Sequence, residues 1–231
     1  AYDLPSLVSP TLKWERIQTL DIGGDFGFFN NELNISFDWY QRTTKDMLAP
    51  GQTMPDVLGA GAPKINAGTL RTRGWELSID WRHHFNEVNV YANASIGDFK
   101  TVITKWDNDS QLLNENYSGK VYGDIWGFET DRYFTKDDFN ADGSYKEGIA
   151  SQKKLEQDGF VYGPGDIKFK DLNNDKEING GEGTVKDHGD LKVIGNTTPR
   201  YQYGFRLGGE WKGIDIDMFF QGVGKCDAWT Q

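Results

Sequence analysis

The sequence predicts an all-β fold of antiparallel, up-and-down strands, and three observations lead to this prediction. Six segments alternate apolar and polar residues with a period of two, as strands with one apolar face do. The segments come in pairs joined by very short turns, whereas the stretches between pairs are long and polar. Several segments are longer than about ten residues, while strands of soluble proteins are usually about five or six.

Short turns at one end of a sheet and long loops at the other are typical of β-barrels that cross an outer membrane. In such barrels only every second strand residue has to be apolar, so the moderate hydrophobic content of 37% is compatible with a membrane wall. The sequence therefore predicts part of a large transmembrane β-barrel with long extracellular loops.

The first strand pair is expected at residues 14–28 and 33–45, joined at Phe29-Asn30-Asn31-Glu32. The second is expected at residues 71–84 and 88–103, and the third at residues 201–211 and 214–222. In the second segment the apolar residues fall on one face, namely Leu33, Ile35, Phe37 and Trp39. Each of the other segments has one apolar face of the same kind.

Two tryptophans bound the apolar face of the third segment. Trp75 and Trp81 lie on one face with Leu77 and Ile79 between them, which separates the two rings by roughly 20 Å along a strand. Aromatic side chains at both margins of an apolar band are typical of the girdles of membrane barrels. A soluble β-sandwich gives the same alternation, so periodicity leaves that alternative open.

Composition excludes several classes of function. The formal charge of -10 and the isoelectric point near 4.8 argue against nucleic acid as a partner, because phosphate binding needs a basic surface. A mean hydropathy of -0.65, without any run of about 18 apolar residues, excludes a membrane-spanning helix. The single cysteine, Cys226, cannot form an internal disulfide.

Two long loops are expected, at residues 46–70 and 104–200. The second is too long to be without structure of its own, and short strands or helices are expected near residues 121–128 and 166–169. It is also rich in aromatic residues that have two interpretations: they stack on sugar rings, or they form a local core. The set comprises Trp106, Tyr117, Tyr122 and Trp126.

Residues 171–182 follow the spacing of a calcium-binding EF-hand loop. The expected ligands are Asp171, Asn173, Asp175, Glu177, Asn179 and Glu182. Lys176 departs from the pattern, because the sharp turn at that position normally takes glycine. The interpretation is therefore a tentative Ca²⁺ site, and the alternative is a polar surface turn without metal. A weaker match, without the closing glutamate, occurs at Asp138, Asn140, Asp142 and Gly143.

No catalytic constellation is expected, and the chain is predicted not to be an enzyme. His83 and His84 are adjacent, so on a strand they point to opposite faces and cannot share a metal ion. Carboxylates also lie in pairs on single strand faces, but polar strand faces carry such pairs routinely. These pairs are Glu76 with Asp80 and Asp215 with Asp217.

Motifs spread along nearly the whole chain carry a family resemblance. They include Thr44-Lys45-Asp46-Met47-Leu48, Gly74-Trp75-Glu76, Gly165-Asp166-Ile167-Lys168-Phe169-Lys170-Asp171-Leu172-Asn173, Pro199-Arg200-Tyr201 and Phe219-Phe220-Gln221-Gly222. In this order they resemble the C-terminal half of the barrel of SusC-like TonB-dependent outer-membrane transporters.

The resemblance implies a location in the bacterial outer membrane and a role in nutrient import. Its expected partners are a SusD-like surface lipoprotein that acts as a lid, TonB acting through an N-terminal region, outer-membrane lipid, and an oligosaccharide or peptide substrate. The chain is then expected to be a fragment that contributes barrel wall and extracellular loops. The alternative is a soluble β-sandwich that binds carbohydrate and carries a calcium loop.

Overall fold

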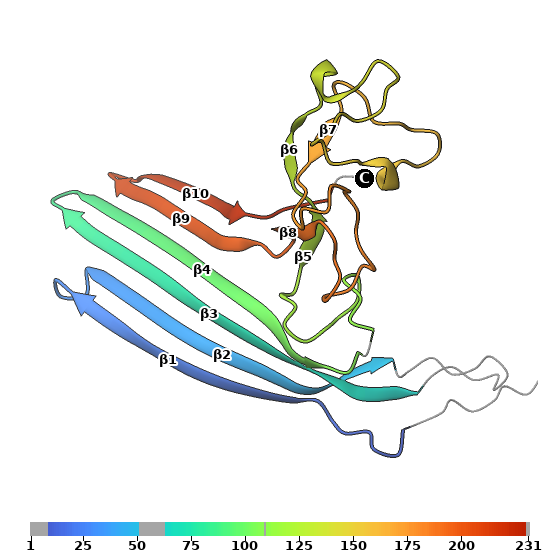
Figure 1. Ribbon diagram of the computed structural model, residues 1–231. Coiled ribbons are helices and arrows are strands. Elements are labelled where there is room, and N and C mark those ends of the chain that lie inside the picture. Colours follow the sequence, from blue (N-terminus) through green and yellow to red (C-terminus); the bar gives the residue numbers. More distant parts are fainter. Residues whose placement is uncertain (1–8, 51–62, 109, 230–231) are drawn as a thin grey trace, which may run out of the picture. The chain divides into compact units, whose positions relative to one another are not determined.

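The computed structural model describes residues 9–50, 63–108 and 110–229, which fall into two compact units (Figure 1). The sheet unit comprises Ala1–Asp107, Ser118–Tyr122 and Thr197–Asp227. The loop unit comprises Asn108–Tyr117, Gly123–Asn196 and Ala228–Gln231. Among the described residues, no helix has the length and apolar character of a membrane span.

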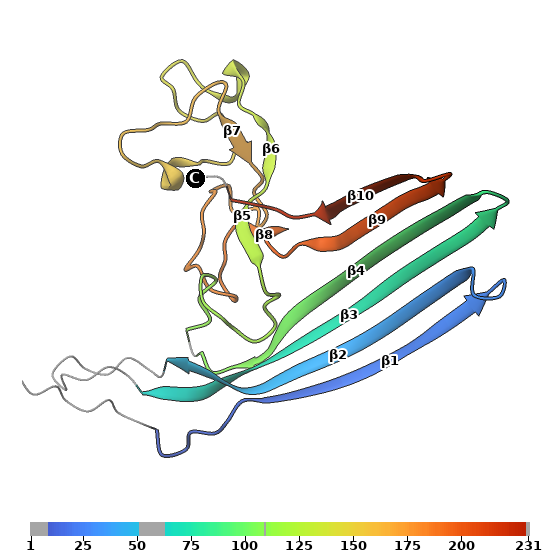
Figure 2. The same cartoon turned by 180° about the vertical axis from the view of Figure 1, so that it is seen from behind.

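The sheet unit contains one six-stranded antiparallel sheet in the order β1-β2-β3-β4-β9-β10, which can be followed from both sides in Figures 1 and 2. Its strands are β1 Arg16–Phe28, β2 Leu33–Pro50, β3 Lys64–Phe85, β4 Val88–Trp106, β9 Arg200–Trp211 and β10 Ile214–Lys225. Every pair of neighbouring strands is antiparallel. The predicted all-β antiparallel fold is therefore confirmed.

The central strands extend further toward the long loops than alternation indicated. β2 runs to Pro50 where the sequence predicted residue 45, and β3 begins at Lys64 where it predicted residue 71. Register shifts interrupt the β2–β3 pairing around Met47, and Asp46 adopts a φ of 59°. Such bulges insert residues that break the period of two while the strands continue to pair, so the pattern ends before the strands do.

The turns between paired strands are short because their residues adopt left-handed backbone conformations. Between β9 and β10, Lys212 and Gly213 have φ values of 49° and 87°, as expected for a two-residue turn whose twist matches that of the strands. Between β3 and β4, Asn86 has a φ of 52°. The turn from β1 to β2 includes three consecutive left-handed residues, Phe29, Asn30 and Asn31.

The pairing of the strands aligns apolar residues in one row across all six strands. From β1 to β10 this row is Phe26, Ile35, Ile79, Ala94, Phe205 and Phe220. Phe26 is 56% exposed and Phe220 is 49% exposed, although both are large hydrocarbon rings. Within the sheet unit this apolar face is continuous, and no other described segment of that unit buries it.

The opposite face is polar, and tyrosines from one strand lie over glycines of the next. Tyr40 on β2 covers Gly74 on β3, and a Cβ atom at Gly74 would lie 2.5 Å from the Tyr40 ring. Tyr91 on β4 covers Gly208 on β9 in the same way, at 2.1 Å. Glycine is required at these two positions because the aromatic rings occupy the space of any side chain.

The loop unit contains two small antiparallel sheets. One pairs β5 Asp124–Phe128 with β8 Leu191–Asn196, and the other pairs β6 Thr130–Tyr133 with β7 Ile167–Phe169. The two remaining elements are single turns of 3₁₀ helix, η2 Lys136–Asp138 and η3 Lys153–Leu155. The sequence predicted short strands or helices near residues 121–128 and 166–169, where β5 and β7 lie, and it did not anticipate β6 or β8.

A small core holds the loop unit together. Ile178 is fully buried, and Phe134 packs against Phe139 with ring centroids 5.1 Å apart. The buried side chain of Gln152 bridges backbone groups of β7: its Nε2 donates to the Ile167 carbonyl at 3.1 Å. Its Oε1 accepts from the Phe169 N–H at 2.7 Å. The long segment between β4 and β9 is therefore a folded unit.

Candidate cation site and the faces of the sheet

The segment that begins at Asp171 wraps its backbone around the carboxylate of that residue. Asp171 Oδ1 accepts from the Asn174 N–H at 2.6 Å, and Oδ2 accepts from the Lys176 N–H at 2.9 Å. Asn174 and Lys176 adopt φ values of 62° and 65°. Lys176 thus occupies the sharp turn that the spacing predicted, in a conformation that favours glycine.

Asp190, at the end of the segment that leads into β8, ties the two ends of this loop together. Its Oδ1 accepts from the Leu172 N–H at 2.7 Å, and its Oδ2 accepts from the Asn179 N–H at 3.0 Å. The residue is fully buried. A buried carboxylate needs such hydrogen bonds, so Asp190 anchors the base of the loop through them.

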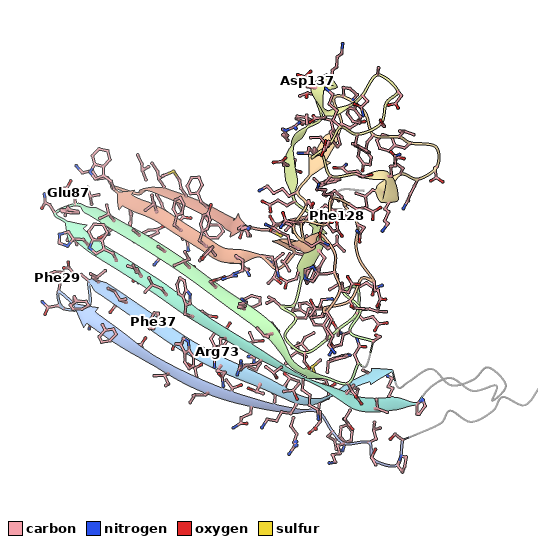
Figure 3. All side chains as sticks on the ribbon, viewed as in Figure 1. Phe29, Phe37, Arg73, Glu87, Phe128 and Asp137 are labelled. Atoms are coloured by element: carbon pink, nitrogen blue, oxygen red, sulfur yellow. The ribbon has the colours of Figure 1, made fainter. Side chains whose placement is uncertain are left out.

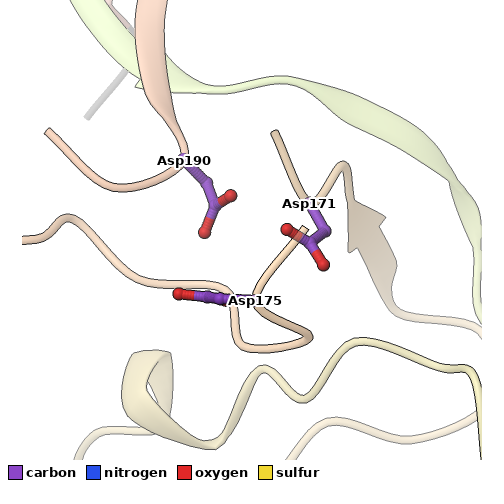
Figure 4. A group of neighbouring side chains, drawn as sticks. All are labelled: Asp171, Asp175 and Asp190. Carbon is purple, nitrogen blue, oxygen red and sulfur yellow. The ribbon is translucent and has the colours of Figure 1, made fainter. Parts of the chain in front are cut away.

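Three carboxylates converge at the loop, as Figure 4 shows. Asp171, Asp175 and Asp190 each offer an oxygen atom, and these atoms lie within 4.8 Å of one another. Each carboxylate oxygen has a second lone pair besides the one used by a backbone N–H. Converging carboxylate oxygens are the ligands that hard cations such as Ca²⁺ prefer, so the chemistry of this group fits a cation.

The other predicted ligands do not belong to the group of three converging carboxylates. Asn173 donates from Nδ2 to Asp175 at 2.9 Å and therefore lies beside the triad. Glu177 forms an ion pair with Lys154 at 2.7 Å, which raises the pKa of that lysine. Asn179 Oδ1 accepts from the Gly181 N–H at 2.8 Å, and Glu182 lies outside the triad.

Sequence reasoning missed Asp190 because it lies beyond the twelve-residue window of the motif. A local signal for it exists: Gly189, with a φ of 53°, precedes it, and an apolar strand follows. This glycine makes close backbone contact with the loop, since a Cβ atom there would lie 2.2 Å from the Asn179 carbonyl oxygen.

The weaker motif near Asp138 is engaged in other interactions. Arg132 binds the Asp138 carboxylate with two hydrogen bonds of 2.7 and 2.6 Å. Together with bonds from Thr135, this guanidinium holds the pKa of Asp138 well below its usual range. Asp142 accepts from Ser144, and neither acid belongs to the group of converging carboxylates found among the described residues.

The polar face of the sheet unit contains a cavity of about 830 Å³. Its lining mixes hydroxyl, amide and carboxylate groups with aromatic rings. Side chains that face it include Ser36, Asp38, Glu76, Ser78, Phe99 and Gln202. Such a surface can form hydrogen bonds with a polar solute, whereas the row of hydrocarbon side chains on the other side of the same strands cannot.

Comparison with known proteins identifies the family. The model of the family described as "TonB dependent receptor-like, beta-barrel" matches residues 2–224. TonB-dependent receptor P3 of Formosa agariphila is 29% identical over 235 residues, which cover 94% of this chain and 21% of that receptor. TonB-dependent receptor SusC of Bacteroides thetaiotaomicron is 27% identical over 217 residues, covering 86% of this chain and 19% of that receptor.

Solved structures show the same fold. The structure of the RagAB peptide transporter matches with a TM-score of 0.65 and 22% identity, over 95% of this chain and 22% of that chain. Its 'open-open' state matches with a TM-score of 0.64 and 22% identity, over 94% of this chain and 21% of that chain. The chain therefore spans about a fifth of the length of the proteins it matches.

These matches confirm the resemblance, the transmembrane barrel and the location in the bacterial outer membrane. They agree with the prediction of a chain that is not an enzyme, and they set aside the soluble β-sandwich. The chain belongs to the family of TonB-dependent receptors, of whose outer-membrane β-barrel it forms a part.

Proposed function

We propose that the six strands form lipid-facing wall in a nutrient importer, and that the loop unit belongs to its extracellular vestibule. The observation that carries this proposal is the exposed apolar row across the sheet. A contiguous patch of large hydrocarbon side chains at a protein surface marks contact with lipid or with another protein. Cross-strand pairs add aromatic margins to this face: Trp39 lies opposite Trp75, and Leu33 lies opposite Trp81.

The polar face would then line the interior of the barrel, where an oligosaccharide or peptide would pass. A SusD-like surface lipoprotein would cover the extracellular opening, and TonB would supply energy through an N-terminal region of the whole receptor. Support comes from the cavity on the polar face and from the similarity to SusC and to the RagAB peptide transporter.

The aromatic residues of the loops differ in their suitability for stacking on a sugar. Trp126 donates from Nε1 to the Tyr117 hydroxyl at 3.1 Å, and Tyr117 is only 6% exposed. This pair therefore belongs to the local core of the loop unit. Tyr122 is 59% exposed, and we propose it as the better candidate for contact with a solute.

Membrane extraction tests the proposed wall. Outer membranes that contain the full-length receptor are washed with high salt and with alkaline carbonate, and then treated with a mild detergent. We expect the receptor to remain in the membrane until the detergent is added, because the apolar row needs hydrocarbon contact. Release by salt or carbonate would contradict the proposal.

We also propose that the acidic triad binds Ca²⁺ and thereby fixes the loop from Asp171 to Asp190. Two observations support this proposal: the three converging carboxylates, and the left-handed turn at Lys176 that the spacing of a calcium loop requires. A cation would offset the repulsion among the three acids, and the buried Asp190 would hold its ligand oxygen in place.

Calcium titration of the full-length receptor by calorimetry tests this second proposal. Asp190→Asn is expected to weaken Ca²⁺ binding by roughly 10- to 100-fold, the size typical of altered metal surroundings. Glu182→Gln serves as the matched control, because Glu182 belongs to the sequence motif but lies outside the triad. Absence of binding heat in the unmodified receptor, or equal loss in both variants, would contradict the proposal.

A further inference from the structure

Basic residues gather on the apolar face immediately beyond its tryptophan margin. Trp39 lies opposite Trp75. Two residues further along the strands, on the same face, Gln41, Arg73 and Lys100 lie side by side in one row. One row further, Thr43, Arg71 and Val102 lie side by side. Three cationic side chains, Arg71, Arg73 and Lys100, thus form a cluster beside the apolar band, which we call the basic cluster.

The charges of the basic cluster are not neutralised by the described residues. Arg73 and Lys100 are directly opposite each other on neighbouring strands, an arrangement that destabilises a sheet when both side chains are charged alike. Arg73 donates from Nε to the neutral Gln41 Oε1 at 2.7 Å. Within the described part of the chain, none of the three cations forms an ion pair with a carboxylate.

Nearby carboxylates already have partners. Arg200 binds Asp98, with Nε donating to Oδ1 at 2.5 Å, and Asp98 is only 8% exposed. Arg16 binds Asp46 at 2.6 Å. Because these acids are occupied, an anion from outside the described chain is the natural counter-charge for the basic cluster.

The cluster lies on the long-loop side of the apolar band, in the middle part of β3 and the second half of β4. In Figure 3, Phe29 and Glu87 mark the end with the short turns, and Arg73 lies about midway along the strands. At the turn end, by contrast, charges are paired within the chain: Lys212 with Glu87 at 2.9 Å, and His83 with Glu32 at 2.6 Å. Excess positive charge is thus found at one margin of the apolar band.

We propose that Arg71, Arg73 and Lys100 bind the phosphate groups of a phosphorylated glycolipid of the lipid A type in the outer leaflet. This inference rests on the proposed lipid-facing wall, since the cluster continues the apolar face at the level where lipid head groups begin. Long loops mark the extracellular end of such barrels. A guanidinium can bind two phosphate oxygens at once, and Lys100 adds a third cation within reach.

Charge complementarity favours this ligand over the proposed substrates. A neutral oligosaccharide would gain little from three cations, and the cluster faces away from the polar side that would line the passage. The chain as a whole is acidic, with a net charge of -10, so general attraction of anions does not account for the cluster. Basic groups beside a membrane surface attract anionic head groups directly.

Native mass spectrometry of the full-length receptor in detergent micelles tests the inference. The probes are diphosphorylated lipid A, its dephosphorylated form with the same acyl chains, and inorganic phosphate. We expect the double variant Arg73→Gln/Lys100→Gln to bind diphosphorylated lipid A roughly 25-fold more weakly, at about fivefold for each cation. The dephosphorylated lipid is expected to bind the variant and the unmodified receptor equally.

The matched control is Arg42→Gln/Arg82→Gln, which removes two exposed cations from the opposite face of the sheet. This control is expected to retain full binding of diphosphorylated lipid A. Equal weakening by both double variants would overturn the inference, because the effect would then reflect net charge alone. So would unchanged binding by Arg73→Gln/Lys100→Gln, or inorganic phosphate binding as tightly as the phosphorylated lipid.

Failure of this inference and failure of the proposed wall give different results. If the wall proposal fails, carbonate releases the receptor without detergent, whatever its affinity for lipid A. If only the present inference fails, extraction still requires detergent, while the double variant binds lipid A as the unmodified receptor does. Refolded variants are compared by circular dichroism, so that loss of structure is not mistaken for loss of a binding group.

Discussion

Glu129 connects two separate parts of the loop unit through two ammonium groups. Lys170 donates to its Oε1 at 2.7 Å, and Lys192 of β8 binds its Oε2. These two hydrogen bonds lower the pKa of Glu129 from 4.5 to about 2. The carboxylate therefore stays ionised at acidic pH and holds β8 beside the segment that follows β7.

This lowered pKa predicts an acid-sensitive contribution to the stability of the loop unit. The folded state favours the ionised form, so the contribution is complete above the unfolded value of 4.5 and declines as the pH falls toward about 2. Glu129→Gln is expected to remove that dependence and to lower stability at neutral pH. Hydrogen exchange of the β5 and β8 amides between pH 7 and pH 2 measures both effects.

Glu147→Gln is the control for this prediction, because Glu147 is exposed and forms no ion pair with the described residues. Its exchange profile is expected to match that of the unmodified chain. If Glu129→Gln leaves the profile unchanged between pH 5 and pH 2, the two lysine contacts do not stabilise the loop unit.

Sequence reasoning at the residue scale found two of the three converging carboxylates. The spacing of Asp171 and Asp175 is local information, because alternate oxygen ligands in one loop converge when the backbone wraps around an ion. Asp190 reaches the same point only because the chain reverses between Asn179 and Gly189. A motif defined by the spacing of twelve consecutive residues carries no information about that chain reversal.

Among the elements, the hairpin from β9 to β10 depends most directly on a single glycine. Gly213 has a φ of 87°, a conformation that side chains with a Cβ atom rarely adopt. Gly213→Ala is expected to destabilise the hairpin by about 1 kcal/mol. Urea unfolding of the full-length receptor in lipid vesicles, followed by tryptophan fluorescence, measures the change in the free energy of unfolding.

Gly204→Ala is the matched control within the same pair of strands. Its φ lies outside the left-handed region, and a Cβ atom there would meet the Phe220 carbonyl oxygen at an ordinary distance of 3.5 Å. We expect a smaller loss at this position. A loss at Gly204 as large as that at Gly213 would show that the effect is one of packing and not of backbone conformation.

The strands differed in how well the sequence predicted them. Alternation located the segments around Trp75 and Phe205 because side chains on a strand repeat every two residues, whatever the strand pairs with. It failed at the bulge around Met47, where pairing persists without alternation. It also gave no sign of β6 Thr130–Tyr133, a strand of four residues whose pattern is too short to distinguish from a turn.

At the scale of the whole molecule, the sheet has an open edge on each side. In the described sheet, β1 pairs with β2 alone and β10 pairs with β9 alone. Unpaired backbone groups within hydrocarbon cost several kcal/mol each, so both edges require neighbours in a membrane. The remaining strands of a full-length receptor would supply those neighbours and close the barrel.

This geometry predicts how the isolated 231-residue chain behaves. In detergent micelles it is expected to self-associate through the edges of β1 and β10, whereas a full-length receptor with a closed barrel is expected to elute as a defined species. Light scattering coupled to size-exclusion chromatography compares the two. A monodisperse monomer of the isolated chain, with protected edge amides, would contradict the expectation.

The contrast between the two ends of the sheet has a consequence for how such receptors diversify. At one end, hairpins such as Lys212-Gly213 leave no room for an added residue without shifting the register of a whole strand. At the other end, the connection between β4 and β9 already contains an independently packed core. Insertions and deletions during evolution should therefore accumulate at the long-loop end, so that relatives retain the sheet while their long connections differ in length and sequence.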